Sequence, residues 1–400
     1  MTNEPTSQKE FIFLVALLTA LVAMSIDTML PALGTMASEF GVSDPNKRQY
    51  IIGSFFAGMT IGTLLSGPIS DSTGRKPAIF AGLLIYVAGS VLCLFSTSFE
   101  MLLAGRALQG VGASSPRIVS MAMVRDGQGG AAMARIMSFV MSVFMLVPIL
   151  APSIGQLVLF VASWRVIFVG FLAMAIIAAI FLQVRQEETL PKEKRVAFSA
   201  RNLFRSAIEF FRFPMAWGYT VAVGFVFASF ICYLGTSQQI FAEQYAQGEW
   251  FAVWFGAFAV AIAFAMIFNG RMVMRHGMRM LAKWAVRGCI VLSAIFLAVA
   301  LAYAGHPPLW TLGLFLFCTF FCCGILFGNY NAMAMEPVGH IAGMAAAISG
   351  TLSTLVALSL GTWFGQQYDG TVMPLVYAFL SMSVVAMLVS EGVEWAKRRR

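Results

Sequence analysis

The stretch Gly67-Pro-Ile-Ser-Asp71-Ser-Thr-Gly74-Arg75-Lys76-Pro77 separates two long apolar runs, at 50–69 and 78–97. A helix of about 20 apolar residues crosses the roughly 30 Å hydrocarbon core of a bilayer. The chain has 400 residues, 59% of them hydrophobic and 11% charged, with a mean hydropathy of +0.82. A soluble fold cannot hide that much apolar surface. We therefore expect an all-α polytopic membrane protein.

Further apolar runs on both sides of this stretch predict twelve transmembrane helices. The expected spans are 11–33, 50–69, 78–97, 100–123, 135–158, 165–183, 214–236, 249–269, 284–304, 309–331, 344–366 and 372–390. The longest segment between spans divides six from six. We expect an N-terminal six-helix bundle (1–183), a cytoplasmic linker (184–213) and a C-terminal six-helix bundle (214–400).

The linker contains an amphipathic stretch, from Arg201 to Phe211. One helical face of it holds Leu203, Phe204, Ala207, Ile208 and Phe211. This pattern predicts a helix that lies along the membrane surface.

Lys and Arg residues predict the orientation, because cytoplasmic loops retain positive charge during insertion. With the N-terminus inside, the inner segments hold 21 of the 26 basic residues and the outer loops hold three, Lys47, Arg48 and Arg165. We therefore expect a multi-pass protein of the inner (cytoplasmic) membrane with both termini in the cytoplasm. The net charge of +8 is spread over short loops, which favours membrane lipids over nucleic acid as the partner.

The loop after the second span of each half indicates an internal repeat. Gly67, Asp71, Gly74 and Lys76 have the same spacing as Gly270, Met274, Gly277 and Arg279. Two copies of one bundle are a common construction of transporters. The sequence thus predicts two pseudo-symmetric six-helix bundles.

The opening stretch resembles the G-x3-D-x2-G-R-K signature between spans two and three of the major facilitator superfamily. Arg106-Ala-Leu-Gln109-Gly110 resembles the superfamily's antiporter-associated arginine motif. Pro148, Pro152 and Gly155 lie in a stretch similar to its proline-glycine antiporter motif, although Ala151 and Gln156 stand where glycines are usual.

With Asp27-Thr-Met-Leu30-Pro31, Val124-Arg125-Asp126 and Trp164-Arg165, the pattern resembles the bicyclomycin/chloramphenicol-resistance branch of drug:proton antiporters. The resemblance implies alternating access between two six-helix bundles and efflux coupled to inward proton flow. It implies a small lipophilic or cationic substrate, no cofactor and the proton gradient as the energy source. We expect the chain to act as a monomer.

Asp27 is the only acidic residue well inside an expected span. An unpaired carboxylate in hydrocarbon costs several kcal/mol, so we predict that Asp27 takes up and releases the coupled proton. A hydrogen-bonded structural aspartate is the alternative. Arg106 lies at a similar expected depth, about 9 Å at about 1.5 Å per residue, and we predict that it shares the coupling role. A clamp to backbone carbonyls is the alternative for Arg106.

Other polar or small positions are candidates for the cavity. Arg117 lies three helical turns after Arg106, with Gly110 and Ala113 on the same stripe, so this face is expected to line the cavity. A snorkelling Arg117 is the alternative. Asn329 and Asn331 are expected to line the cavity of the second half or to cap the end of the span at 309–331.

The opening stretch itself is predicted to be a conformational latch. Its members are Gly67, Asp71, Gly74, Arg75 and Lys76. The three charged residues are expected to form ion pairs in one facing state that are broken in the other. A topology signal is the alternative for the two basic residues, but it does not require Asp71. For Pro148, Pro152 and Gly155, helix bending and packing are the alternative to an antiporter role.

The same residues weigh against other classes of protein. The six cysteines all lie in apolar runs and no histidine completes a metal site, so we expect no metal. No clustered nucleophile or nucleotide-binding loop is visible, which argues against an enzyme and against ATP as the energy source. A proton-coupled transporter of a metabolite or siderophore remains the main alternative, and a membrane-embedded enzyme or receptor is a remote one.

Overall fold

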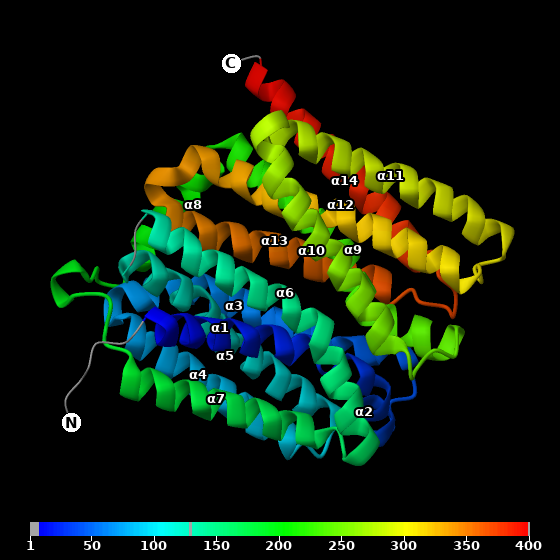
Figure 1. Ribbon diagram of the computed structural model, residues 1–400, viewed down its shortest axis with the longest axis horizontal. Helices are drawn as coiled ribbons and strands as arrows, with labels where there is room; N and C mark the ends of the chain where they lie inside the picture. The colour runs from blue at the N-terminus through cyan, green and yellow to red at the C-terminus, as the bar shows by residue number, and fades with distance from the viewer. Residues whose placement is uncertain (1–7, 128–129, 399–400) are drawn as a thin grey trace. The chain divides into compact units, whose positions relative to one another are not determined.

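The computed structural model describes residues 8–127 and 130–398, and within these ranges it contains helices and no strands. Figure 1 shows the helices in chain order from blue to red. The first nine elements are α1 (Gln8–Asp27), η1 (Leu30–Ala32), α2 (Leu33–Glu39), η2 (Pro45–Gln49), α3 (Tyr50–Thr73), α4 (Arg75–Leu94), α5 (Phe99–Gly127), α6 (Gly130–Val161) and α7 (Arg165–Arg185). The others are η3 (Lys192–Lys194), α8 (Ala200–Phe211), α9 (Pro214–Gln238), the π-helical η4 (Gln239–Gln244), α10 (Phe251–His276), α11 (Met278–Ala302), α12 (Leu309–Met335), η5 (Glu336–Ile341), α13 (Ala342–Gly365) and α14 (Met373–Arg398).

Residue contacts divide the chain into two compact units. Unit 1 comprises the described residues up to Val42 and the segment Ser54–Leu203, and unit 2 comprises Ser43–Gly53 and the described residues from Phe204 onward. The short segment Ser43–Gly53 therefore packs with unit 2, although the chain before and after it belongs to unit 1.

Each unit is a bundle of long helices. In unit 1, α4 packs on α5 and α7, and α1 packs on α5 and α6. In unit 2, α9 packs on α12, α13 and α14, and α12 packs on α10 and α11. Helices α4 and α5 pack closely because glycines lie at their interface. A Cβ at Gly112 would lie 2.3 Å from the backbone nitrogen of Tyr86. Small residues of this kind let membrane helices approach closely.

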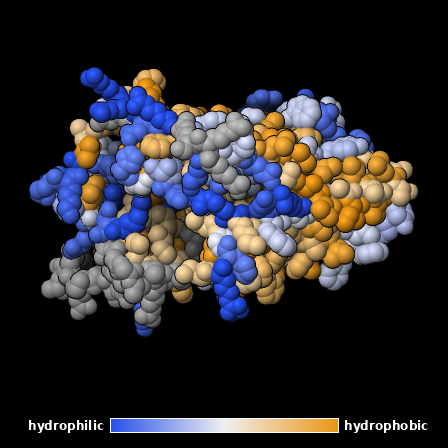
Figure 2. All heavy atoms as spheres, turned by 90° about the horizontal axis from the view of Figure 1, so that it is seen from above, coloured by the Kyte–Doolittle hydropathy of each residue, from blue (hydrophilic) through white to orange (hydrophobic). Residues whose placement is uncertain are grey.

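The outer surface of the helices is apolar, as expected for helices in lipid. Leu84, Val161 and Trp284 are exposed by 70%, 87% and 66%. Figure 2 shows broad hydrophobic areas beside hydrophilic ones on the face in view. Nine segments of the described residues are long and apolar enough to cross a membrane, and one of them, Leu309–Gly365, contains both α12 and α13.

Twelve helices, α1, α3 to α7 and α9 to α14, correspond to the twelve predicted spans, so the predicted all-α polytopic fold class is confirmed. The least apolar of them is α5, which carries Arg106 and Arg117 within its length. Arg399 and Arg400, counted above among the inner basic residues, lie outside the described residues.

The first span differs from its prediction, because it is not one continuous helix. The structure ends α1 at Asp27 and resumes at η1 and α2. Pro31 explains the interruption: a proline has no N–H to donate to the carbonyl four residues earlier, which is that of Asp27, and its ring clashes with that carbonyl. Asp27 therefore lies at a helix break and not in the middle of a helix.

Candidate functional site

The carboxylate of Asp27 is buried inside unit 1, with 7% of the residue exposed. Among the described residues no hydrogen-bond donor or cation is bonded to it. The hydroxyl of the next residue, Thr28, is also buried without a hydrogen-bond partner in the described structure. Two adjacent polar groups without partners are unusual in a protein interior, where such groups are nearly always satisfied.

The proline-glycine motif of α6 contacts the chain at this point. A Cβ at Gly155 would lie 2.0 Å from the carbonyl oxygen of Thr28, so only a glycine permits this approach. Pro148 and Pro152 lie inside α6, and Pro152 is buried. The motif predicted from the sequence is thus brought next to Asp27, with its glycine packed on the residue that follows the carboxylate.

Arg106 is completely buried on α5, and its guanidinium donates to neutral oxygens of α1 and of its own helix. Its Nη2 donates to the carbonyl oxygen of Ser25 at 3.0 Å, and its Nη1 donates to Oε1 of Gln109. The guanidinium also lies 4.5 Å from the ring centroid of Phe55, a cation–π distance. Arg106 and Asp27 form no ion pair in the described part of the chain, although Ser25 is only two residues from Asp27.

A chain of hydrogen bonds continues from Arg106 to α4. Gln109 Nε2 donates to Ser90 Oγ at 2.8 Å, and the hydroxyls of Ser25 and Tyr86 are 2.5 Å apart. All of these side chains are buried. The network links α1, α4 and α5 through polar groups that water does not reach.

The other α5 residues predicted to line the cavity are Gly110, Ala113 and Arg117, and their surroundings differ. Gly110 is a packing position, because a Cβ there would lie 2.0 Å from the carbonyl oxygen of Phe55 on α3. Ala113 is also fully buried. Arg117 is exposed, and its Nη1 contacts Met59 Sδ at 3.8 Å. These residues do not form one continuous polar stripe open to solvent.

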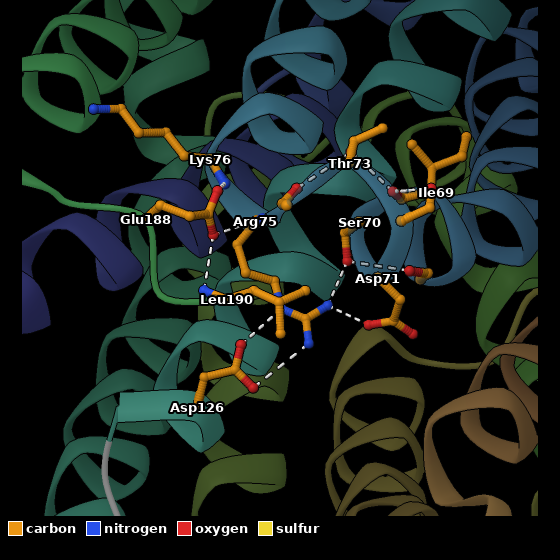
Figure 3. Close-up of polar contacts among 12 residues, drawn as sticks. Ile69, Ser70, Asp71, Thr73, Arg75, Lys76, Asp126, Glu188 and Leu190 are labelled. Atoms are coloured by element: carbon orange, nitrogen blue, oxygen red, sulfur yellow. Dashed lines mark hydrogen bonds and ion pairs between the residues drawn. The ribbon is translucent and has the colours of Figure 1, made fainter. Parts of the chain in front are cut away.

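The turn between α3 and α4 is a dense polar cluster, drawn in Figure 3. Arg75 is buried, and its Nε donates to Asp126 Oδ2 at 2.7 Å. Its Nη1 donates to Asp71 Oδ1 at 2.5 Å and to Ser70 Oγ at 2.7 Å. The guanidinium therefore joins the end of α3 to the end of α5 within unit 1.

Glu188 of the linker completes the cluster from the other side (Figure 3). Its carboxylate accepts from the backbone N–H groups of Arg75 and Lys76, at 2.9 and 3.1 Å. A carboxylate at the first N–H groups of a helix satisfies orphan donors and complements the helix dipole. Lys76 Nζ donates to the carbonyl oxygens of Gln183 and Gln186 at the end of α7. The linker is thus fastened to the predicted latch, which the sequence alone did not indicate.

The two glycines of this stretch have different environments. Gly74 has φ +108° and ψ 161°, a conformation almost restricted to glycine, and a Cβ there would lie 2.5 Å from Glu188 Oε2. A Cβ at Gly67 would meet nothing within 4 Å.

We therefore expect Gly74→Ala to destabilise the cluster by about 1–3 kcal/mol, because it adds backbone strain and displaces the Glu188 carboxylate. Gly67→Ala is the matched control and should have almost no effect. Thermal unfolding of both variants in detergent, with transport measured in parallel, tests this. Equal stability of the two variants would contradict the geometry.

The second half repeats this arrangement with other residues. Gly277 also has a positive φ, +77°, at the turn between α10 and α11. Arg279 pairs with Glu336 at 2.9 Å and with Glu394 at 2.8 Å. Met274, at the position equivalent to Asp71, is 86% exposed. An arginine that joins the turn to a carboxylate at the C-terminal end of the fourth helix is therefore common to both halves.

The two asparagines predicted to line the cavity of the second half differ in burial. Asn329 is buried and donates to Asn269 Oδ1 at 2.7 Å and to the Ile325 carbonyl at 3.0 Å. Asn331 is exposed and donates to the Phe327 carbonyl at 2.8 Å. Nearby, three half-buried rings of α9 and α12 group together: Phe227 lies 6.0 Å from Phe230 and 5.9 Å from Phe327.

The segment Ser43–Gly53 holds polar residues that sequence reasoning missed. Arg48 is buried and donates to Gln238 Oε1 at 2.7 Å and to Glu243 Oε1 at 2.5 Å. Gln49 is also buried and donates to Gln239 Oε1 and to the Gly365 carbonyl, both at 2.9 Å. No local signal identified them, because their partners are about 190 and 316 residues away in the chain.

No group of three or more His, Cys, Asp or Glu side chains among the described residues is arranged to hold a metal ion. The arrangement offers instead a buried carboxylate, an arginine network and polar clusters at helix ends. This chemistry suits proton transfer and conformational change more than bond making.

Comparisons with known proteins agree with the fold. A family model described as Major Facilitator Superfamily matches residues 15–362. A bicyclomycin resistance protein homolog of Haemophilus influenzae is 25% identical, with 96% of each chain covered. A chloramphenicol resistance protein of Pseudomonas aeruginosa is 26% identical, with 92% of this chain and 87% of the other covered. The xylose transporter XylE of E. coli, in a partially occluded inward-open conformation, has a TM-score of 0.74 at 12% identity, covering 95% of this chain and 96% of the other.

The family model covers most of the chain, and the two relatives carry the names of the branch that the motifs resemble, so the predicted resemblance is confirmed. The chain belongs to the Major Facilitator Superfamily and is a multi-pass membrane transporter, not an enzyme.

Proposed function

We propose that this transporter exports small lipophilic compounds in exchange for protons by alternating access. The single observation that carries the proposal is the carboxylate of Asp27, buried in unit 1 with no bonded cation or donor among the described residues. An ionised carboxylate in this position costs about 3 kcal/mol or more, whereas its protonated form carries no charge. A change in access to water or to a cationic substrate therefore changes its protonation.

The surroundings of Asp27 support a role in coupling. It lies where α1 breaks, next to the unsatisfied Thr28 hydroxyl and to the closely packed Gly155 of α6. Arg106 is held by Ser25 and Gln109, so it does not neutralise the carboxylate directly. Movement of α6 against this point would alter the space around Asp27, which links the proton site to a conformational change.

The substrate class rests on the second half and on the relatives. The second-half helices bury no charged side chain among the described residues, and they present the half-buried rings of Phe227, Phe230 and Phe327. Aromatic and deformable apolar surfaces suit varied lipophilic ligands. The relatives named for bicyclomycin and chloramphenicol resistance make compounds of that kind the first candidates.

We also propose that the protein lies in the cytoplasmic membrane of a bacterium, acts as a monomer and has both termini in the cytoplasm. The excess of Lys and Arg in alternate loops, 21 against three, supports this orientation. The proton gradient is its energy source, and no cofactor takes part.

Transport by the purified chain in sealed vesicles tests the function. Chloramphenicol and a panel of other lipophilic compounds are offered with and without a pH gradient. We expect compound movement against its own gradient and opposite in direction to the protons. Movement in the same direction as protons would indicate a metabolite-type symporter, and no movement with any compound would refute the proposal.

A further inference from the structure

Helix α8, which lies between the two halves in the chain, has exposed apolar residues on one side and a buried side elsewhere. Phe204, Ile208 and Phe211 follow the spacing i, i+4, i+7 and are exposed by 69%, 44% and 50%. Phe210, on another side of the helix, is completely buried. The helix therefore uses one side to pack on protein and turns an apolar side outward.

Three arginines form a basic stripe beside the apolar face. Arg201, Arg205 and Arg212 are all exposed. At about 100° per residue they lie about 60–100° around the helix axis from Phe204, all on the same flank. Among the described residues none of the three guanidinium groups has a hydrogen-bond or ion-pair partner. Three unpaired cations on one side of a helix form a positively charged surface, which attracts an anionic ligand.

Other contacts hold α8 in position and leave this surface free. Glu209 Oε1 and His340 Nε2 are 2.7 Å apart, which fastens α8 to η5 within unit 2. The spanning helix α9 begins at Pro214, three residues after α8 ends at Phe211. The apolar face is thus attached directly to the end of a membrane helix.

We infer that α8 lies in the headgroup region of the membrane and binds anionic phospholipid through Arg201, Arg205 and Arg212. The apolar face enters the acyl-chain boundary, and the arginines pair with phosphate groups through several hydrogen bonds each. The inference rests on the proposed function only in its orientation, which puts α8 at the cytoplasmic leaflet. A second protein or a second copy of the chain on the same face is the competing occupant.

The first test measures binding of phosphatidylglycerol to the purified full-length protein by native mass spectrometry, with phosphatidylcholine for comparison. Arg201→Gln/Arg205→Gln should weaken phosphatidylglycerol binding about 25-fold, because each of the two basic residues near an anionic surface contributes about fivefold. The matched control, Lys192→Gln/Lys194→Gln, removes the same charge from exposed positions of the same linker. It should change binding little, and equal losses in both variants would overturn the inference.

The second test locates the apolar face. An environment-sensitive fluorophore attached to the Ile208→Cys variant, corrected for labelling of the wild-type chain, should report an apolar surrounding in phosphatidylglycerol vesicles. An aqueous signal there would overturn the inference. So would a dimer that dissociates on Phe204→Ser/Phe211→Ser, because a second copy would then cover the face. Neither readout depends on transport, so lipid binding without transport would contradict only the proposed function.

Discussion

Replacement of Asp27 by Asn is expected to abolish uphill transport while leaving the protein folded. A pH difference of one unit drives about a tenfold concentration ratio for each proton exchanged, because about 1.4 kcal/mol corresponds to a factor of ten. Asn cannot take up or release a proton, so the ratio in the variant should fall to about 1. Asn is similar in size to Asp and puts no charge into this buried position, which makes a folding defect the less expected result.

The controls separate coupling from loss of structure. Energy-independent exchange of compound across the vesicle membrane should persist in Asp27→Asn, because it needs no net proton movement. Glu249→Gln removes a carboxylate from an exposed site and should transport like the wild type. If Asp27→Asn still built a tenfold ratio, the proton would bind elsewhere and the proposed coupling would be refuted.

Replacement of Arg106 by Ala should lower the free energy of unfolding by about 3 kcal/mol or more. The change leaves the Ser25 carbonyl and the Gln109 side chain without their donor, at about 1–3 kcal/mol for each unsatisfied group, and it opens a cavity beside Phe55. Arg106→Lys should be intermediate, since an ammonium keeps the charge but not the planar fork that reaches both acceptors.

Arg117→Ala is the matched control on the same helix. Arg117 is exposed and, among the described residues, its guanidinium makes only the weak contact to Met59 Sδ, so its loss should change stability little. Thermal unfolding of the three variants in detergent measures the difference. Similar midpoints for Arg106→Ala and Arg117→Ala would show that the buried network does not hold α1, α4 and α5 together.

These two predictions assign different roles to residues that the sequence grouped together. Similar depth in the membrane suggested that Asp27 and Arg106 communicate. In the structure the guanidinium is bonded to Ser25 and Gln109, which agrees with the alternative of a backbone clamp. Asp27 retains an unsatisfied carboxylate and is the stronger candidate for proton transfer. A shared role would require Arg106 to leave its present partners during the cycle.

The sequence alone determined the class of protein and the number of spanning helices. Hydrophobicity along the chain is a local property, and a bilayer of fixed thickness converts it directly into helices. The glycine of the Gly74 turn, the amphipathic α8 and the motif residues next to Asp27 were also visible, because each depends on the type and spacing of nearby residues.

Only the tertiary structure decided which polar groups meet. The rotation of each helix about its axis determines that Gly110 packs on α3 and that Gly155 reaches Thr28. Glu188 meets the start of α4 across 113 residues, and Gln49 meets Gly365 across 316. Hydrogen bonds act over about 3 Å, so partners this distant in the chain are chosen by the fold and cannot be read from local sequence.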